Sequence, residues 1–367
     1  MTPETRRKIR DSLLIPVLAA LSGLVVAAIP LLMTNTNPLT AYGHLFSSAF
    51  SCAEFEHCNL FTTLQLATPL MLTGLSAVVA FRSGLFSLGQ EGQLLLGGMM
   101  AAWLGYVLHL PPGIHAVVAM LGAMLVGGVY GWIPGVLRVR LGVNEVISTL
   151  VLNNIARLFV LYLINFPLRA DQSTTAHSPV IDETARLAAF APGSKWGIGF
   201  VLALLAAALV FIYLWRSSPG YEQRMAGQAP FFARFGGVPS ARAAIRGMLI
   251  SGALAGLAGA IQALGVHYRM LDGFSAGLGF DGLTAAILGQ VHPVGTVVVA
   301  IFFAGLRQGA QIGLQLTSKV PRELGGGIIA LMILFVAADM LYRRRIESAG
   351  ALWRRLRGRK TPLEESA

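Results

Sequence analysis

Residues 196–215 read WGIGFVLALLAAALVFIYLW, and residues 216–246 continue as RSSPGYEQRMAGQAPFFARFGGVPSARAAIR. The first stretch holds no charged residue. It is long enough to cross the hydrocarbon core of a bilayer, which takes about 20 apolar residues in a helix. The second stretch holds five Arg and leads into another apolar run at 247–266. This order predicts two membrane crossings joined by a basic loop.

The composition of the whole chain indicates the same class of protein. Of its 367 residues, 55% are hydrophobic and 12% are charged, and the net charge is +11. Soluble domains carry about 25% charged residues, so half that share predicts an all-α polytopic membrane protein. The positive charge does not indicate nucleic-acid binding, because the Lys and Arg cluster in short stretches beside apolar runs.

Apolar windows predict about ten transmembrane helices. They fall at residues 12–32, 62–81, 86–108, 114–137, 143–164, 196–215, 247–266, 280–291, 294–313 and 326–342. The eighth window is too short to cross a bilayer as a straight helix. The first is longer than the apolar core of a typical signal peptide, so we interpret it as an uncleaved helix.

The Lys and Arg residues predict how the chain crosses the membrane. With the N-terminus inside, the inner segments hold 20 of the 28 Lys and Arg, and the outer segments hold six. Basic loops stay in the cytoplasm, so both termini are expected on the cytoplasmic side. The membrane is expected to be the bacterial cytoplasmic (inner) membrane. The expected divisions are a cytoplasmic N-terminus (1–11), a transmembrane domain (12–342) with periplasmic loops (33–61 and 165–195) and a cytoplasmic segment (216–246), and a basic cytoplasmic tail (343–367).

Both cysteines of the chain, Cys52 and Cys58, fall in the outer loop 33–61. An oxidising periplasm would join such a pair in a disulfide. Two free thiols are the alternative, and the sequence leaves both open.

Two similar stretches suggest an internal repeat. FRSGLFSLG at 81–89 and FSAGLGFDG at 274–282 share the pattern F-x-x-G-L-x-x-x-G. The expected topology places the first near the inner side of the membrane and the second near the outer side, as in halves of opposite orientation. The glycines of both stretches predict broken helices, with close helix packing through small residues as the alternative.

The signatures of a phosphate loop and of a zinc protease are absent from the sequence. It contains no G-x-x-x-x-G-K-[ST] and no H-E-x-x-H. The seven His are scattered. We therefore expect no enzyme activity, no metal site and no bound cofactor on this chain.

The 216–246 segment contains a predicted short helix. Pro230 suits the first turn of a helix, and Gly236 and Gly237 suit its end. Such a helix would expose three Phe below the membrane, where water alone is an unfavourable neighbour. It either lies on lipid headgroups or docks into a groove of a cytoplasmic partner.

Several polar residues fall inside the predicted spans. Glu145 and Asn153 share one helix face, and Asn153 and Arg157 are four residues apart. Polar groups at membrane depth either line a route for a polar solute or pair with one another, for example Glu145 with Arg307 or Arg157. The candidate pathway residues are Gln90, Glu91, Asn144, Glu145, Asn153, Asn154 and Asp281.

Longer motifs resemble a known family. The pattern G-x-x-x-R-x-x-G-x-x-P-x-x-A-x-x-x-G at 220–237 is similar to the coupling segment of ABC-importer permeases. FRSGLFSLGQEGQLLLGG, VNEVISTLVLNNIA, GFDGLTAAILGQVHPVG and VPRELGGGIIALMILFVAA, which begin at residues 81, 143, 279 and 320, resemble the ribose and branched-chain amino acid permease superfamily. Within it, they resemble most the branch that handles nucleosides and simple sugars.

This resemblance implies a transport subunit that works with other chains. Two ATP-binding cassette subunits would use ATP and dock on the coupling segment. A second permease chain would complete the route, with a different chain favoured and an identical one as the alternative, and an extracytoplasmic binding protein would deliver the solute. Membrane lipid would surround the assembly. The residues carried over to ATPase coupling are Arg224, Gly227, Pro230, Phe231, Ala233, Arg234 and Gly237, although FFARF is more aromatic than the family pattern.

The cargo is less determined than the class of transporter. The resemblance implies nucleosides, and the few charges inside the spans favour a neutral polar solute. Simple sugars and branched-chain amino acids stay open as alternatives. An ion-coupled secondary transporter would need intramembrane carboxylates, for which Glu145, Asp281 and Glu91 are the candidates.

Overall fold

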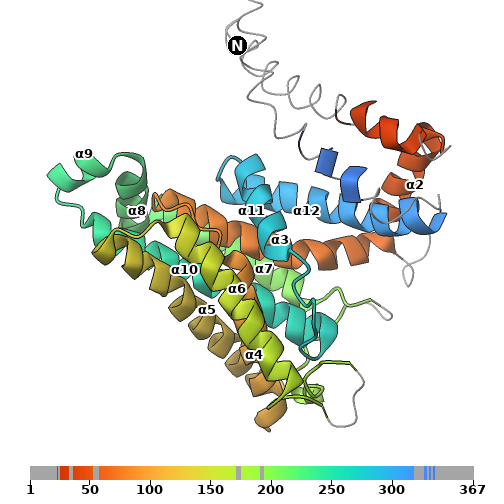
Figure 1. Cartoon of the computed structure of the whole chain (residues 1–367), viewed down its shortest axis with the longest axis horizontal. Coiled ribbons are helices and arrows are strands. Elements are labelled where there is room, and N and C mark those ends of the chain that lie inside the picture. Colours follow the sequence, from red (N-terminus) through yellow and green to blue (C-terminus); the bar gives the residue numbers. More distant parts are fainter. Residues whose placement is uncertain are drawn as a thin grey trace, which may run out of the picture. The chain divides into compact units, whose positions relative to one another are not determined.

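The computed structural model describes residues 23, 25–32, 36–52, 58–170, 175–190, 194–317, 326–328, 330–331 and 334. Regular structure in these residues is helical, and no strand occurs among them (Figure 1). The three β-bridges that are present are isolated pairs. The expectation of an almost entirely helical protein is thus confirmed for the described part of the chain.

The chain divides into two compact units. One consists of Met1–Ser47 and Gly309–Ala367, and the other is Ser48–Gln308. The candidate functional residues all lie in the second unit. The first predicted span, 12–32, the last, 326–342, and the basic tail lie largely or wholly outside the described residues.

Six described helices are long and apolar enough to cross a membrane. They are Asn59–Arg82 (α3), Ile114–Leu141 (α5), Glu145–Asn165 (α6), Ile198–Arg216 (α7), Ser240–His267 (α10 at Ser240–Gln262 with η3 at Ala263–His267) and Pro293–Gln315 (α12 at Pro293–Gly309 with the start of η4 at Ala310–Thr317). Each matches a predicted window to within a few residues, except that α10 begins seven residues before its window at 247.

Two further helices complete the apolar part of the second unit. α4, Gln90–Val107, occupies the third predicted window and is not among the six candidate spans. α11, Leu278–Leu288, occupies the eighth window, and its 11 residues are too few to cross a bilayer. The remaining elements are α2 (Pro38–Phe50), η2 (Glu183–Ala185), α8 (Ser218–Gln228) and α9 (Pro230–Phe235).

Helix α10 lies at the centre of the second unit, with α3, α4 and α5 packed around it. Its glycines face the backbones of its neighbours. A Cβ on Gly252 or Gly256 would meet carbonyl oxygens of α5, and a Cβ on Gly259 would meet a carbonyl oxygen of α4. Membrane helices approach this closely only through small residues, so the glycine spacing of α10 sets the packing of the bundle.

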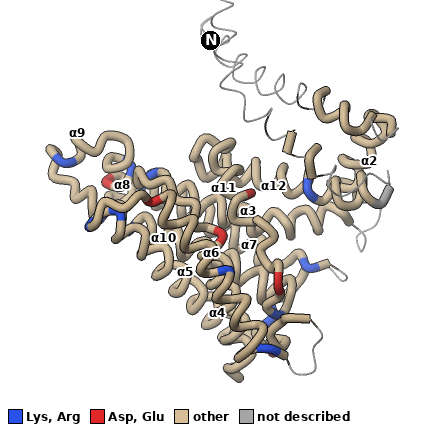
Figure 2. The backbone as a smooth tube through the Cα atoms, in the orientation of Figure 1, with Lys and Arg blue, Asp and Glu red and all other residues tan. Residues whose placement is uncertain are grey.

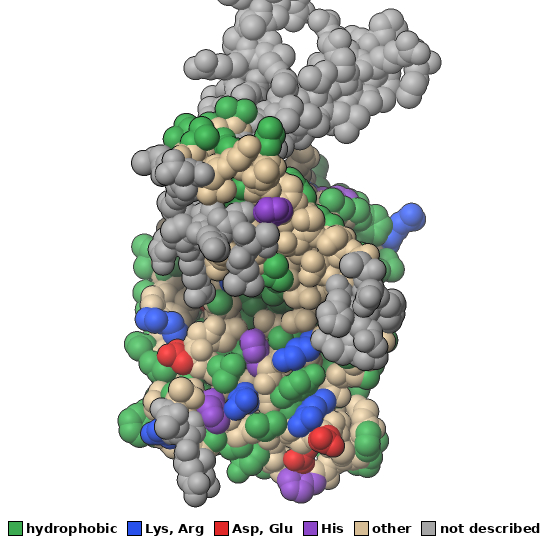
Figure 3. Space-filling view, turned by 90° about the vertical axis from the view of Figure 1, so that its right-hand side faces the viewer, with side chains coloured by type: hydrophobic (Ala, Val, Ile, Leu, Met, Phe, Trp, Pro, Cys, Tyr) green, Lys and Arg blue, Asp and Glu red, His purple; other side chains and the backbone are tan. Residues whose placement is uncertain are grey.

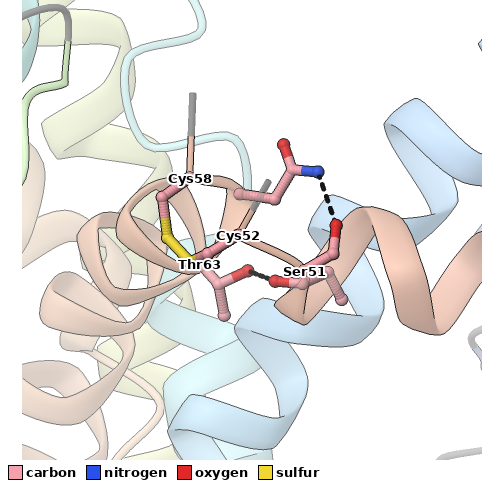
Figure 4. Close-up of a disulfide and its surroundings, with 6 residues drawn as sticks. Ser51, Cys52, Cys58 and Thr63 are labelled. Atoms are coloured by element: carbon pink, nitrogen blue, oxygen red, sulfur yellow. Dashed lines mark hydrogen bonds between the residues drawn. A yellow bond between two sulfur atoms is a disulfide. The ribbon is translucent and has the colours of Figure 1, made fainter. Parts of the chain in front are cut away.

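Cys52 and Cys58 are joined by a disulfide (Figure 4). The bridge closes a short loop just before α3. Next to it, the hydroxyl of Thr63 donates to the carbonyl oxygen of Ala49 at 2.6 Å. Of the two alternatives that the sequence left open, the structure contains the disulfide.

We predict that Gly256→Val destabilises the protein, because the new side chain meets backbone atoms of α5 that cannot move alone. Overpacking of this kind costs about 1–3 kcal/mol. Gly43→Val is the matched control, since a Cβ there has no neighbour within 4 Å. Thermal unfolding in detergent would measure both, and equal midpoints for the two variants would contradict the packing described for α10.

Candidate functional site

The chain between α3 and α4 is not helical, and Asn153 of α6 binds its backbone at the point where α4 begins. The amide nitrogen Nδ2 of Asn153 donates to the carbonyl oxygen of Leu88 at 2.7 Å, and its Oδ1 accepts from the N–H of Gly92 at 2.9 Å. Asn153 is 7% exposed. Unpaired backbone groups are costly where water is excluded, so this amide allows the break to exist inside the bundle.

Glu91, in the first turn of α4, holds the start of α11. Its carboxylate accepts hydrogen bonds from the hydroxyl of Ser275, from the N–H of Gly277 at 3.3 Å and from the N–H of Gly279 at 2.8 Å. The first N–H groups of a helix lack intrahelical partners and carry partial positive charge. A carboxylate at this position therefore stabilises the start of α11, and the helix end in turn stabilises the negative charge of Glu91.

These contacts join the second repeated motif to the residues that follow the first, because Glu91, two residues after 81–89, bonds directly to Gly279 of 274–282. The placing of the two motifs near opposite sides of the membrane stays a prediction. From this meeting point the two helices run in opposite directions. α4 passes Gly259 of α10, whereas α11 leads to Val291, whose carbonyl oxygen accepts from Nε of Arg82 at 2.9 Å.

The charged candidates pair differently from the sequence-based alternatives. Glu145 pairs with Arg138 at 3.2 Å, and not with Arg307 or Arg157. Gly142 ends α5 with φ of 68°, which turns the chain back so that Glu145 lies beside the last turn of α5. Arg307 instead binds Asp281 at 2.7 Å and the carbonyl oxygen of Ala276 at 3.0 Å.

The other pathway candidates separate into buried and exposed groups. Asn144 caps α6, because its side chain accepts from the N–H of Val146 at 2.9 Å. Gln90 is 1% exposed, and neither polar atom of its side chain has a hydrogen-bond partner among the described residues. Asn154 is exposed on α6, where its Nδ2 donates to the carbonyl oxygen of Leu150 at 3.2 Å.

The 216–246 segment forms α8 and α9, which project from the bundle with Lys and Arg gathered around them (Figures 1 and 2). Gln223 of α8 is fully buried. Its Nε2 donates to the carbonyl oxygen of Val79 and to the hydroxyl of Ser83, both at 2.8 Å. Its Oε1 accepts from the hydroxyl of Tyr213 at 2.6 Å. One amide thus fastens α8 to the ends of α3 and α7.

Further contacts tie α8 to its neighbours. Arg246 of α10 donates to the carbonyl oxygen of Pro219 at 2.7 Å and pairs with Glu222 at 3.3 Å. Gly227 packs on the turn after α3, where a Cβ would lie 2.5 Å from the carbonyl oxygen of Arg82. These contacts hold α8 against α3 and α10 at the same end of the bundle.

Two guanidinium groups flank the indole of Trp215 at the end of α7. Arg82 of α3 and Arg224 of α8 lie 5.3 Å and 5.4 Å from the ring centroid, distances typical of cation–π contacts. His292, in the turn before α12, lies 4.8 Å from the same ring. Four elements therefore meet at one side chain beside α8.

Helix α9 has the bounds that the sequence indicated. It begins at Pro230 and ends before Gly237, whose φ is 77°. Ala233 is buried at 1% exposure, whereas Phe231, Phe232 and Phe235 are exposed by 81%, 69% and 93%. Arg234 is also exposed. The helix thus presents three aromatic rings and one cation away from the chain.

A different face of the molecule carries basic and histidine side chains among hydrophobic ones (Figure 3). Among the described residues, Arg186 and Lys195 both lie over the ring of Tyr268, at 5.1 Å and 5.2 Å from its centroid. The predicted periplasmic loop that contains them is fastened to η3, since the N–H of Leu187 donates to the carbonyl oxygen of Leu264 at 3.0 Å.

The sequence did not indicate Gln223, Tyr213, Trp215 or Arg82. The available signal was the polar Gln223 within a helix that carries small residues at 220, 226 and 227, a spacing that suits close packing. In the described part of the chain, no group of three or more His, Cys, Asp or Glu is placed to hold a metal ion.

A bundle of apolar helices with broken segments, and a fastened polar segment that projects from it, define the class of a membrane transport subunit. The chain belongs to the family of permease components of branched-chain amino acid transport systems, whose model matches residues 59–337. It is a permease of an ABC transporter and thus a transport component rather than an enzyme. No solved structure matches it significantly.

Curated relatives extend over most of the chain. The guanosine ABC transporter permease NupP of Bacillus subtilis is 36% identical, over 90% of this chain and 94% of the relative. The nucleoside ABC transporter permease NupB of Lactococcus lactis is 30% identical, over 92% and 94%. The glucose ABC transporter permease TsgB13 of Haloferax volcanii is 29% identical, over 90% and 88%.

We predict that Glu91→Ala lowers the free energy of unfolding by about 1–3 kcal/mol, because the N–H groups of Gly277 and Gly279 lose their acceptor. Glu91→Gln keeps one acceptor oxygen and is expected to lose less. Glu183→Ala, at a side chain 87% exposed, is the control. Thermal unfolding of the three variants tests this, and a Glu91→Ala protein as stable as the control would exclude the capping role.

We predict that Gln223→Ala loosens α8 without unfolding the bundle. The change leaves the hydroxyl of Tyr213 and the carbonyl oxygen of Val79 without this partner. Gln228→Ala, at the exposed end of the same helix, is the matched control. Hydrogen exchange would show faster exchange in α8 for Gln223→Ala alone. Unchanged exchange in both variants would argue against the anchor.

Proposed function

We propose that this chain forms one half of the transmembrane route of an ABC importer for nucleosides or related neutral polar solutes. Membership of the permease family supplies the transport role. The relatives named for guanosine and nucleosides, at 36% and 30% identity over nine-tenths of the chain, support the class of cargo. ATP is used by separate subunits, and no cofactor is bound by this chain.

The observation that carries the proposal is the geometry of α8 and α9. α8 is fastened to α3, α7 and α10 through Gln223 and Arg246, and α9 extends beyond it with exposed aromatic rings. A short helix that exposes 93% of a Phe needs a covering partner. We assign that partner as the ATP-binding cassette subunit, which would push α8 and thereby the ends of three spans.

The finer architecture belongs to the same proposal. We place about ten spans in a bacterial inner membrane, with both termini and the 216–246 segment in the cytoplasm. Two cassette subunits dock from below, and an extracytoplasmic binding protein delivers solute from above. A second permease chain completes the route, and a different chain is favoured over an identical one, as in many transporters of the branch that this chain resembles.

Within this architecture, ATP-driven closure of the cassettes rocks the two permease halves between outward-open and inward-open states. The broken helices α4 and α11 meet at Glu91 and are held by its partly buried hydrogen bonds, so they would move together. Asn154 and Asp281, which are exposed and half-exposed, are the pathway candidates best placed to meet solute, whereas Asn144, Glu145 and Asn153 hold structure.

We predict that Arg234→Glu and Gly237→Pro both lower cassette binding and uptake severalfold without unfolding the membrane part. Arg234 is exposed on α9, and proline at 237 can adopt neither the φ of 77° nor the N–H bond to the carbonyl oxygen of Arg234. Co-purification of the cassette subunits and vesicle uptake measure the effect.

The controls for this prediction are Arg140→Glu, an exposed reversal of charge on α5, and Gly236→Ala, at a residue with φ of −77°. Both are expected to behave as the unmodified protein. If all four variants retain cassettes and uptake equally, the coupling role of α9 is wrong.

Simple sugars are the second candidate cargo, which the glucose permease of Haloferax volcanii favours. The two candidates are separated by uptake of radiolabelled guanosine and glucose into vesicles that hold the complete reconstituted transporter. ATP-dependent accumulation of guanosine and not of glucose supports the first. The reverse result replaces it with the second.

A further inference from the structure

Helix α6 lies at the edge of its unit and leaves most of its surface uncovered. One stripe of it is buried, consisting of Thr149, Asn153, Ala156, Val160 and Ile164. The rest is mainly apolar, and Ile147, Ile155 and Leu158 are each more than half exposed. Two polar side chains interrupt this surface one turn apart, Asn154 and Arg157.

Arg157 differs from the other cationic residues of the described spans in combining a central position with the lack of an ion pair to any described residue. Only Arg157 and Arg307 lie more than two turns from both ends of a candidate span. Arg307 is neutralised by Asp281 at 2.7 Å. Arg157 is exposed and has no ion pair with any described residue. It follows Glu145 by twelve residues, which is about 18 Å along the helix, so it lies at membrane depth.

A guanidinium at this depth is unfavourable in contact with lipid chains. Such residues in membrane helices face a cavity or a partner, because exposure to hydrocarbon costs several kcal/mol. The guanidinium has five N–H donors and no acceptor, so its partner must offer acceptors. Within this chain, the carboxylates of the described spans are already engaged, since Glu145 is held by Arg138 and Asp281 by Arg307.

We propose that Arg157, with Asn154 beside it, binds the base of a nucleoside as it passes through the route, and that it prefers 6-oxopurines. This inference rests on the proposed function. Guanine and hypoxanthine present two neighbouring acceptors, O6 and N7, which match the fork of the guanidinium. Adenine presents N7 beside an amino group that is itself a donor. Only one N–H group of the guanidinium fork therefore finds an acceptor on adenine.

Asn154 suits the second position of this site. Its Nδ2 is engaged by the carbonyl oxygen of Leu150 at 3.2 Å, which leaves its Oδ1 directed away from that bond as an acceptor. An acceptor next to a donor fork complements a base that has N–H groups beside its carbonyl oxygen. The pair therefore selects for hydrogen-bonding pattern rather than for charge.

The first experiment measures guanosine and adenosine uptake by the complete reconstituted transporter, with binding protein saturated by each nucleoside in turn. Arg157→Gln is expected to raise the concentration for half-maximal guanosine uptake about tenfold, with little effect on adenosine. Arg157→Lys keeps the charge but not the fork, and is expected to lose the same preference. Arg140→Gln is the control.

The second experiment uses labelling of an introduced cysteine. Cys52 and Cys58 do not compete for the reagent, because both are joined in a disulfide. Arg157→Cys is expected to react with a hydrophilic maleimide and to be protected by guanosine. Ile155→Cys, on the other side of the exposed surface of α6, is expected to stay unreactive.

The outcomes separate this inference from the function on which it rests. An unmodified transporter that carries no nucleoside overturns the proposed function and this inference with it. Nucleoside uptake with an unchanged guanosine-to-adenosine ratio in both Arg157 variants overturns this inference alone. So does an Arg157→Cys protein that stays unlabelled in the complete transporter, because Arg157 then faces lipid or a partner subunit.

Discussion

The amide of Gln223 is the interaction on which the rest of the mechanism depends. It is fully buried, and its donor and acceptor atoms bind α3 and α7 at once. A buried amide that loses its partners costs about 1–3 kcal/mol, so α8 and the ends of these helices form one mechanical body. In the proposed mechanism, a force applied to α8 would reach the ends of α3 and α7 through this amide.

Exclusion of water explains why most polar residues of the spans face one another. Asn153 and Glu91 satisfy the backbone of two broken helices, and Glu145 and Asp281 each neutralise an arginine. Once these pairs are made, few polar side chains remain to meet a solute. Besides the half-exposed Asp281, they include Asn154 and Arg157 on the exposed side of α6, where the surface is otherwise mainly apolar.

The sequence predicted the features of the fold that depend on local residue patterns. Apolar runs placed the spans, the short eighth window became α11, and proline and glycine bounded α9. It could not predict contacts between distant segments, such as Glu91 with Gly279, which are 188 residues apart. It also missed Arg138 as the partner of Glu145, because the left-handed turn at Gly142 decides that pairing.

The most direct test of this account is a photo-crosslinking residue placed at Phe232 of α9 in the assembled transporter. The side chain is 69% exposed, so the probe is expected to disturb the fold little. The account predicts an adduct with the ATP-binding cassette subunit. Crosslinking to the extracytoplasmic binding protein, or to lipid alone, would contradict it.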